Sequence, residues 1–97
     1  SEVGNLNLLQ ASILIAVFTD PGITQAKLGK LLRLDSAAMS RNLKRLGKDG
    51  NKGYNLVERR RNKDNPNTLE LFPSARGKRK QKKVLKKWFM IQQATDR

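Results

Sequence analysis

The sequence predicts a small, mostly helical fold that contains one β-hairpin. Apolar residues recur at helical spacing in several segments, and a run with period-two alternation follows a polar turn in the second half of the chain. The predicted order is helix, helix, tight turn, helix, hairpin, helix. A chain of 97 residues is long enough for one small domain. We therefore expect a single domain over residues 1–97, whose last helix spans residues 74–95.

The first predicted helix spans residues 6–18. Its apolar positions at helical spacing are Leu6, Leu9, Ile13, Ala16 and Val17. Further apolar residues widen this stripe until the last turn is apolar nearly all round, which is typical of a helix that is central to a core or lies at a subunit contact. The turn-forming sequence Asp-Pro-Gly at residues 20–22 then ends the helix.

The second predicted helix is short and lies within residues 24–34. Thr24 is a good N-cap. The apolar face consists of Leu28, Leu31 and Leu32. Gly29 lies inside this helix, where glycine costs about 1 kcal/mol relative to alanine. We therefore expect another element to approach the backbone closely at that position.

The third predicted helix, over residues 36–47, follows a tight turn and is capped by Asp35 or Ser36. Its core face consists of Met39, Leu43 and Leu46. Its outer face and flanks carry Ala37, Ser40, Arg41, Asn42, Lys44, Arg45 and Lys48. Two short helices on a tight turn, the second polar and basic outside, form the helix-turn-helix pattern, whose second helix enters the major groove of DNA. We expect Arg41 to contact a base and the basic residues after it to reach phosphates.

The hairpin is predicted from an extended segment at residues 54–59 and an alternating segment at residues 68–72. Between them, asparagine, aspartate and proline reverse the chain over residues 60–67. The arginine run 59–61 therefore leads into a charged tip. The alternative is an ordinary solvated basic run.

The last predicted helix is capped by Ser74, and its apolar face consists of Val84, Leu85, Trp88, Phe89 and Ile91. Eight of the twelve residues from Arg76 to Lys87 are basic. Because cations at a helix N-terminus oppose the macrodipole, this half either frays or binds an anion. In the interpretation that we favour, the basic cluster increases the non-specific affinity of the protein for phosphates. The rival readings are a localisation signal and a membrane-surface segment.

The charge of the chain is strongly positive and unevenly placed. There are 21 Lys and Arg against 8 Asp and Glu, for a net charge of +13, and every basic residue lies at or after Lys27. Phosphate polyanions are the expected partners. An anionic membrane is disfavoured, and the longest apolar run, residues 13–18, is far too short to span a bilayer.

The chain contains no cysteine and no histidine. Their absence excludes disulfides, zinc fingers and every Ser-His or Cys-His catalytic pair. We therefore expect neither an enzyme nor a metal or other cofactor.

Residues 22–46 (GITQAKLGKLLRLDSAAMSRNLKRL) and 56–78 (LVERRRNKDNPNTLELFPSARGK) resemble the winged helix-turn-helix of the MarR family. The matching positions are Thr24, Gln25, Leu28, Leu31, Asp35, Ser40, Arg41, Leu43, Leu46, Leu56, Val57, Arg59, Asp64 and residues 74–77. The resemblance implies dimeric, sequence-specific binding of double-stranded DNA, with the second motif helix in the major groove and the hairpin, or wing, at the minor groove. The DNA-contacting residues it implies, together with those above, are Thr24, Gln25, Ser36, Ala37, Ser40, Arg41, Asn42, Lys44, Arg45, Lys48, Arg59, Arg60, Arg61 and Lys63.

The chain departs from the family pattern in two respects. The family wing carries Asp-x-Arg, whereas Asn65 and Pro66 follow Asp64 here, so Arg59–Arg61 or Lys63 would supply the minor-groove charge. Members of the family are usually longer, with an extra N-terminal helix and a further C-terminal helix that build the dimer and its ligand pocket, whereas this chain is short at both ends. We therefore expect no effector pocket, and a homodimer would have to use Leu6–Phe18 and Val84–Ile91.

The leading hypothesis is a winged-helix transcriptional regulator in the cytoplasm of a prokaryote or acting on viral DNA. Two alternatives remain open: a nucleic-acid binder without sequence choice, used in replication or packaging, and a protein-interaction module. Comparable affinity for random and selected DNA would favour the first alternative, and absence of DNA binding at low salt would favour the second.

Overall fold

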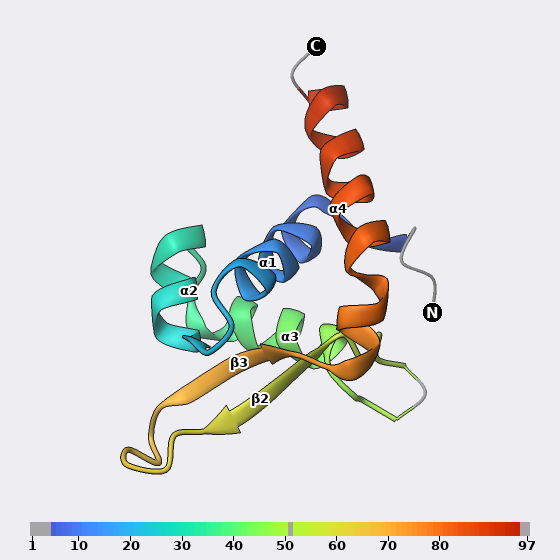
Figure 1. The fold of residues 1–97 in the computed structure, drawn as a ribbon. Helices are drawn as coiled ribbons and strands as arrows, with labels where there is room; N and C mark the ends of the chain where they lie inside the picture. The colour runs from blue at the N-terminus through green and yellow to red at the C-terminus, as the bar shows by residue number, and fades with distance from the viewer. Residues whose placement is uncertain (1–4, 51, 96–97) are drawn as a thin grey trace.

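The computed structural model describes residues 5–50 and 52–95. Its elements are α1 (Leu8–Thr19), β1 (Ile23–Thr24), α2 (Gln25–Leu32), α3 (Ser36–Leu46), β2 (Val57–Arg61), β3 (Leu69–Pro73) and α4 (Ala75–Thr95). Figure 1 shows the β2–β3 hairpin extending below the helices and α4 rising away from them. The predicted order of helices and hairpin is confirmed, and β1 is an additional short strand that the sequence did not predict.

The helix starts are set by capping side chains. Asn7 caps α1 in a reciprocal capping box with Gln10, so the helix begins at Leu8 rather than at Leu6. Thr24 Oγ1 accepts a hydrogen bond from the backbone at the start of α2, as predicted. Of the two cap candidates for α3, Asp35 is the cap, and its carboxylate accepts from the Ala38 N–H at 2.7 Å.

The core lies between the helices and the sheet. Its fully buried side chains come from every helix, from strand β3 and from the segment that precedes β2; the largest are Ile13, Leu14, Leu28, Met39, Leu43, Leu46, Leu56, Leu71, Val17 and Val84. Met39, Leu43 and Leu46 are the predicted inner face of α3. These contacts orient α3 with its opposite face in solvent.

Three residues predicted on apolar inner faces are exposed instead. Leu31 is 64% exposed, Leu85 41% and Phe89 57%. On α2 the residue that reaches the core is Leu28, and on α4 the buried Val84 is followed at helical spacing by Trp88 and partly buried Ile91. The helical spacing of apolar residues predicted which side of each helix is apolar. However, the part of that side that the core buries is narrower than the apolar stripe.

The sheet has three antiparallel strands in the order β1-β3-β2. Arg59 pairs with Leu71, Arg60 with Glu70 and Arg61 with Leu69. The arginine run is therefore part of strand β2, and the tip consists of residues 62–68. The sequence placed the chain reversal too early because asparagine, aspartate and proline all lie in the same stretch as the last two arginines.

Residues 54–56 connect α3 to the hairpin. Their backbone N–H groups donate to the carbonyls of Arg45, Gly47 and Leu46 at 2.8, 2.9 and 2.7 Å. These acceptors are the carbonyls that a helix end leaves without intrahelical partners. The last turn of α3 is thereby fixed to the chain that enters β2.

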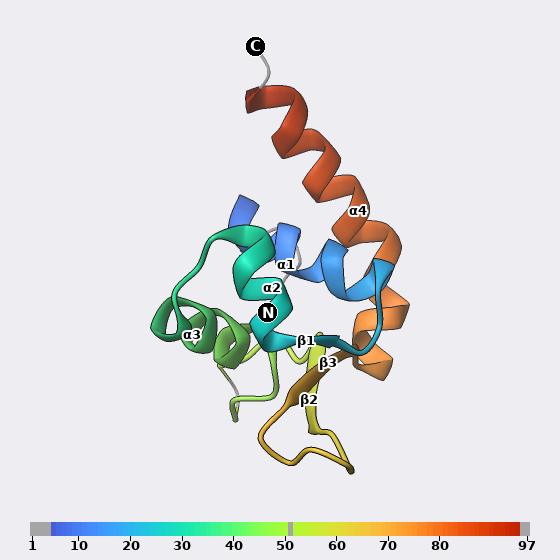
Figure 2. The same ribbon diagram turned by 90° about the vertical axis from the view of Figure 1, so that its left-hand side faces the viewer.

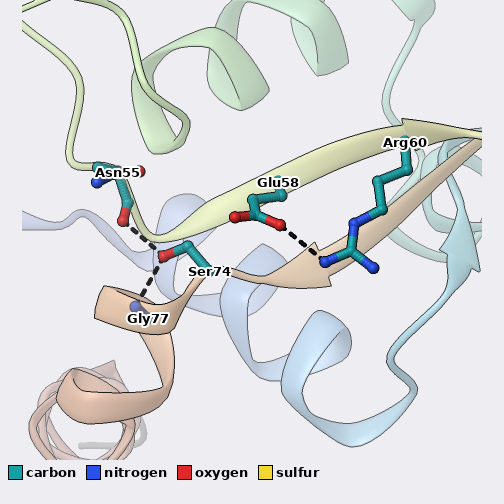
Figure 3. A network of polar contacts seen from close by, with 5 residues as sticks. All are labelled: Asn55, Glu58, Arg60, Ser74 and Gly77. Carbon is teal, nitrogen blue, oxygen red and sulfur yellow. Dashed lines mark hydrogen bonds and ion pairs between the residues drawn. The ribbon is translucent and has the colours of Figure 1, made fainter.

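The carbonyl groups of the same three residues hold the start of α4, and Figure 3 shows the contacts of Ser74 with Asn55 and Gly77. Leu56 O accepts from the Ser74 N–H at 3.0 Å, and Asn55 O accepts from the Ser74 hydroxyl at 2.7 Å. Ser74 Oγ also accepts from the Gly77 N–H at 2.8 Å, which is the predicted capping role. Ser74 therefore joins two elements with one buried side chain.

Gly77 is required by this close approach. A Cβ at position 77 would collide with the carbonyl oxygen of Leu56. Gly29 is less constrained, since a Cβ there would lie 3.3 Å from the carbonyl oxygen of Leu34. Leu34 belongs to the turn that directly follows α2, and the nearest atom of another element is Met39 Cε of α3, at an ordinary 4.0 Å, so among the described residues the close approach predicted for another element is not found.

Gly77→Ala is expected to lower the free energy of unfolding by about 1–3 kcal/mol, because the added methyl group collides with backbone that cannot move without shifting β2. Helix propensity alone would change the stability in the opposite direction, because alanine is the better helix former by about 1 kcal/mol. A loss of stability would therefore report the collision. Urea unfolding followed by far-UV circular dichroism measures the change. Gly29→Ala is the matched control and is expected to have a smaller effect. A gain in stability for Gly77→Ala would contradict the close approach.

Candidate nucleic-acid interface

The solvent face of α3 is the centre of the candidate site. Because Met39, Leu43 and Leu46 face the core, the opposite side of the helix is exposed. That side carries Ser36, Ala37, Ser40, Arg41, Lys44 and Lys48, the last just beyond the helix end. The first half of this face is small and polar, and the second half is basic. It combines room for close approach with groups that can donate to bases and phosphates.

Two flanking residues of α3 are partly engaged within the protein. Asn42 is half-buried, and its Nδ2 donates to the carbonyl oxygen of Ala38 at 2.8 Å. The Arg45 guanidinium lies over the ring of Tyr54, 5.4 Å from the centroid, although Arg45 remains exposed. Tyr54 itself is buried. Of the α3 cations, Arg41 and Lys44 are therefore the more readily available for DNA.

The start of α2 lies beside α3. Thr24 Oγ1 accepts from the Lys27 N–H at 3.1 Å, which leaves its hydroxyl hydrogen available to an acceptor. Gln25 Oε1 is buried and has no hydrogen-bond partner. Both residues line a hollow with the first turn of α3 and the β3 side of the hairpin. The carboxylate of Asp35 already occupies the α3 N-terminus, so a phosphate there would meet negative charge.

The hairpin arginines differ in their surroundings. Arg60 forms an ion pair with Glu58 at 2.9 Å, shown in Figure 3, and its guanidinium lies 4.3 Å from the centroid of the Phe72 ring. Arg61 donates to the carbonyl oxygen of Pro66 at 2.9 Å. Arg60 and Arg61 are thus held by local contacts, although the side chains of Arg59, Arg60 and Arg61 are all exposed.

The hairpin tip is organised by Asn62. Its Oδ1 accepts from the backbone N–H groups of Asp64 and Asn65 at 2.8 and 2.9 Å, and its Nδ2 donates to Glu70 at 3.2 Å. This arrangement is an Asx turn anchored to β3. Lys63, which is exposed, is the one basic residue of residues 62–68.

A hollow between the end of α3 and β2 brings the two parts of the site together. Its lining includes Lys44 and Lys48 from the α3 side and Arg59 and Arg60 from β2. Asp49 and Glu58 also line it. The sequence did not predict that Glu58 and Phe72 position Arg60. Residues two apart on a strand share a face, and that spacing relates Glu58 to Arg60.

Few of the positive charges are neutralised within the molecule. In residues 5–50 and 52–95 the ion pairs are Lys27–Asp20 and Arg60–Glu58. The α3 cations and Lys63 form none in this part of the chain. The described residues contain no cluster of His, Cys, Asp or Glu that could hold a metal ion. Nor does any helix among them have the length and apolarity needed to cross a bilayer.

Comparison with known proteins identifies relatives of this fold. The sequence model of the MarR family matches residues 6–66. Among solved structures, MarR has a TM-score of 0.71 and 26% identity over 91% of this chain and 63% of its own. A SlyA-like transcription regulator from Listeria monocytogenes has a TM-score of 0.72 and 27% identity over 89% and 54%. A mutant of E. coli MarR complexed with operator DNA has a TM-score of 0.69 and 24% identity over 82% and 54%.

The comparison with curated proteins found no match. The chain spans between about half and two thirds of the length of the solved structures named above. The family model, in contrast, covers well over half of this chain and contains the whole helix-turn-helix and strand β2. The fold is that of the MarR winged helix, with α2 and α3 as the helix-turn-helix and β2–β3 as the wing. On this evidence, the chain belongs to the MarR family.

Proposed function

We propose that this protein binds double-stranded DNA as a transcriptional regulator, with α3 in the major groove and the wing at the minor groove. The observation that carries the proposal is the exposed face of α3, where Ser40, Arg41 and Lys44 lie opposite the buried face of the same helix. An α-helix is about 10–12 Å across, which fits a major groove about 12 Å wide. Related structures support the proposal, since AbfR and a mutant of E. coli MarR were each solved bound to DNA.

The roles within α3 follow from chemistry. Arginine pairs with guanine through two hydrogen bonds, so Arg41 is the proposed base-reading residue. Lys44, Arg45 and Lys48 lie further along the helix and are proposed to contact phosphates. Ser36 and Ala37 complete the face, Asn42 flanks it, and Thr24 and Gln25 at the start of α2 are proposed to contact the backbone of the DNA.

The wing contributes positive charge near the minor groove in this proposal. The arginine that the family carries two residues after the aspartate is absent here. Arg59, Arg60, Arg61 and Lys63 are therefore proposed to supply the positive charge at the minor groove. Lys63 is in the tip itself, whereas the arginines lie along β2. The action would be regulatory rather than catalytic, on prokaryotic or viral DNA in the cytoplasm.

We further propose that the protein acts as a dimer. Of the two segments expected at the interface, Leu6–Phe18 contributes most of its large apolar side chains to the core of its own chain. The second segment instead leaves Leu85 and Phe89 exposed on α4, with Met90 beside them and 57% exposed. A second copy would bury this α4 patch, which is otherwise in contact with water.

Arg41→Ala is expected to weaken binding to a selected DNA site by about 1–3 kcal/mol and to relax the preference at one base position. Lys44→Ala is the control within the same helix, and it is expected to weaken all sequences alike because a phosphate contact carries no sequence information. Binding-site selection on random duplexes, followed by titration of selected and random DNA, measures both. Equal losses on both DNAs for Arg41→Ala would remove its base-reading role.

Replacing Arg60 and Arg61 together with glutamine is expected to weaken binding and to flatten the slope of log K against log salt by about 1–2. The control removes the same charge on exposed residues of α2, as Lys27→Gln with Lys30→Gln, and is expected to leave the slope near its original value. Fluorescence anisotropy across a salt series gives the slopes. A slope unchanged by the arginine replacements would identify the run as solvated surface.

Leu85→Gln with Phe89→Gln is expected to weaken the dimer by roughly 30-fold or more, since an interface aromatic residue contributes ~2 kcal/mol or more when it is a main contact. Analytical ultracentrifugation over a concentration series measures the dissociation constant. Leu31→Gln is the control, because Leu31 is a similarly exposed leucine on another helix. A molecular mass that does not differ between the double variant and the control would contradict the α4 contact.

A further inference from the structure

A second positively charged surface lies on α4 and is not used by the proposed α3 and wing contacts. It consists of Lys78, Arg79, Lys82, Lys83 and Lys86, all exposed, and is called here the α4 basic stripe. Lys78, Lys82 and Lys86 follow one another at i+4 along the outer side of the helix. Val84 and Gly77 face the interior, so the stripe occupies the side of α4 opposite the core.

The charges of the stripe are uncompensated within the described chain. No ion pair joins any of its five side chains to a residue of segments 5–50 and 52–95, and residues 75–95 contain no Asp or Glu. Like charges at i+4 repel, and a cation near the first turn of a helix, as Lys78 is, opposes the macrodipole. The structure nevertheless shows regular helix from Ala75. A bound polyanion would offset both of these unfavourable terms.

The stripe and the exposed face of α3 belong to helices that lie on different sides of the core. Met39, Leu43 and Leu46 of α3 and Val84 of α4 belong to the same core cluster, so each helix turns its apolar residues to that core and its basic residues to solvent. In Figure 2, α3 is at the left, the first turns of α4 are at the right, and the strands lie between them. A straight duplex held by α3 and the wing would not extend to the stripe.

The length and composition of the stripe match a nucleic-acid backbone. Eight residues of helix rise about 12 Å, and a duplex carries one negative charge per ~1.7 Å of its axis, or roughly seven over that distance. The exposed side chains of residues 78–83 include no apolar group that could insert into a bilayer. The exposed apolar residues of α4 begin only at Leu85. Charge complementarity in water therefore favours DNA over a membrane surface.

We infer that the α4 basic stripe binds the phosphate backbone of a second DNA duplex, so that one protein bridges two DNA segments. The contact is without sequence preference, because lysine and arginine side chains on phosphates read no base. It is independent of the base-reading role of Arg41. The protein would thus hold one duplex on α3 and the wing and another on the opposite side of its core.

The test is a capture assay with two separate duplexes of about 20 base pairs, one immobilised and one fluorescent, between about 50 and 200 mM salt. Short separate duplexes exclude capture through the bent flank of a single DNA. The wild-type protein is expected to retain the fluorescent duplex. Lys78→Gln, Lys82→Gln and Lys86→Gln together are expected to abolish retention and to reduce the salt slope of this step by about 3, while the protein still binds the immobilised duplex.

Two further variants make the result specific to the stripe. Lys27→Gln with Lys30→Gln and Lys52→Gln removes the same charge from exposed positions elsewhere and is expected to retain the second duplex. Lys→Arg at positions 78, 82 and 86 keeps the charge and is expected to do so as well. Glutamine and lysine have similar helix propensities, and circular dichroism verifies that α4 is intact in the variants.

Three results would overturn the inference. The wild-type protein could fail to retain the second duplex. Retention that is unchanged in the stripe variant would mean that bridging uses two copies of the α3 surface in a dimer. Equal loss in the Lys27, Lys30 and Lys52 control would mean that net charge, rather than the stripe, holds the second duplex. Phosphatidylglycerol vesicles are tested in parallel; loss of vesicle binding in the stripe variant with duplex retention intact would assign the stripe to membranes.

Discussion

The arrangement of the site depends on the backbone of residues 54–56. Their N–H groups donate to the carbonyls at the end of α3, and their carbonyls accept from Ser74 and Arg76 at the start of α4. Because each of the three residues uses both backbone groups, this short segment fixes the recognition helix, the base of the wing and the last helix relative to one another. The close approach also restricts position 77 to glycine, and it places the uncharged end of β2 beside the core.

This connection explains how a molecule with a small core can carry a strongly charged surface. The apolar residues of α3 and α4 meet in one cluster, while their basic residues remain on opposite outer sides. Ion pairs contribute little to the fold, because the two pairs among residues 5–50 and 52–95 are exposed and exposed pairs typically contribute about 0–1 kcal/mol. The positive charge is thus available to partners rather than used for stability, and DNA binding is expected to be strongly salt-dependent.

Features determined by neighbouring residues could be predicted from the sequence. The caps Thr24 and Asp35 and the inner face of α3 follow from local chemistry and spacing. Strand β1 could not be predicted because its two residues form a strand only by pairing with β3, far along the chain. The exposure of Leu31 and Phe89 depends on how far the core extends, which periodicity does not report. The outer face of α3 was predictable, but the ties of Arg60 to Glu58 and Phe72 depend on the register of the hairpin.

In the proposed mode of binding, α3 and the wing form the first contact with DNA. An NMR titration with ¹⁵N-labelled protein and a selected duplex measures this most directly. With DNA below one equivalent, we expect backbone amide signals of Ser40, Arg41 and Lys44 and of residues 59–63 to shift first, while those of α1 remain near their original positions. Signals on α4 would follow only with excess DNA. Shifts that begin on α4 and leave α3 unchanged at every DNA concentration would contradict this order of contacts.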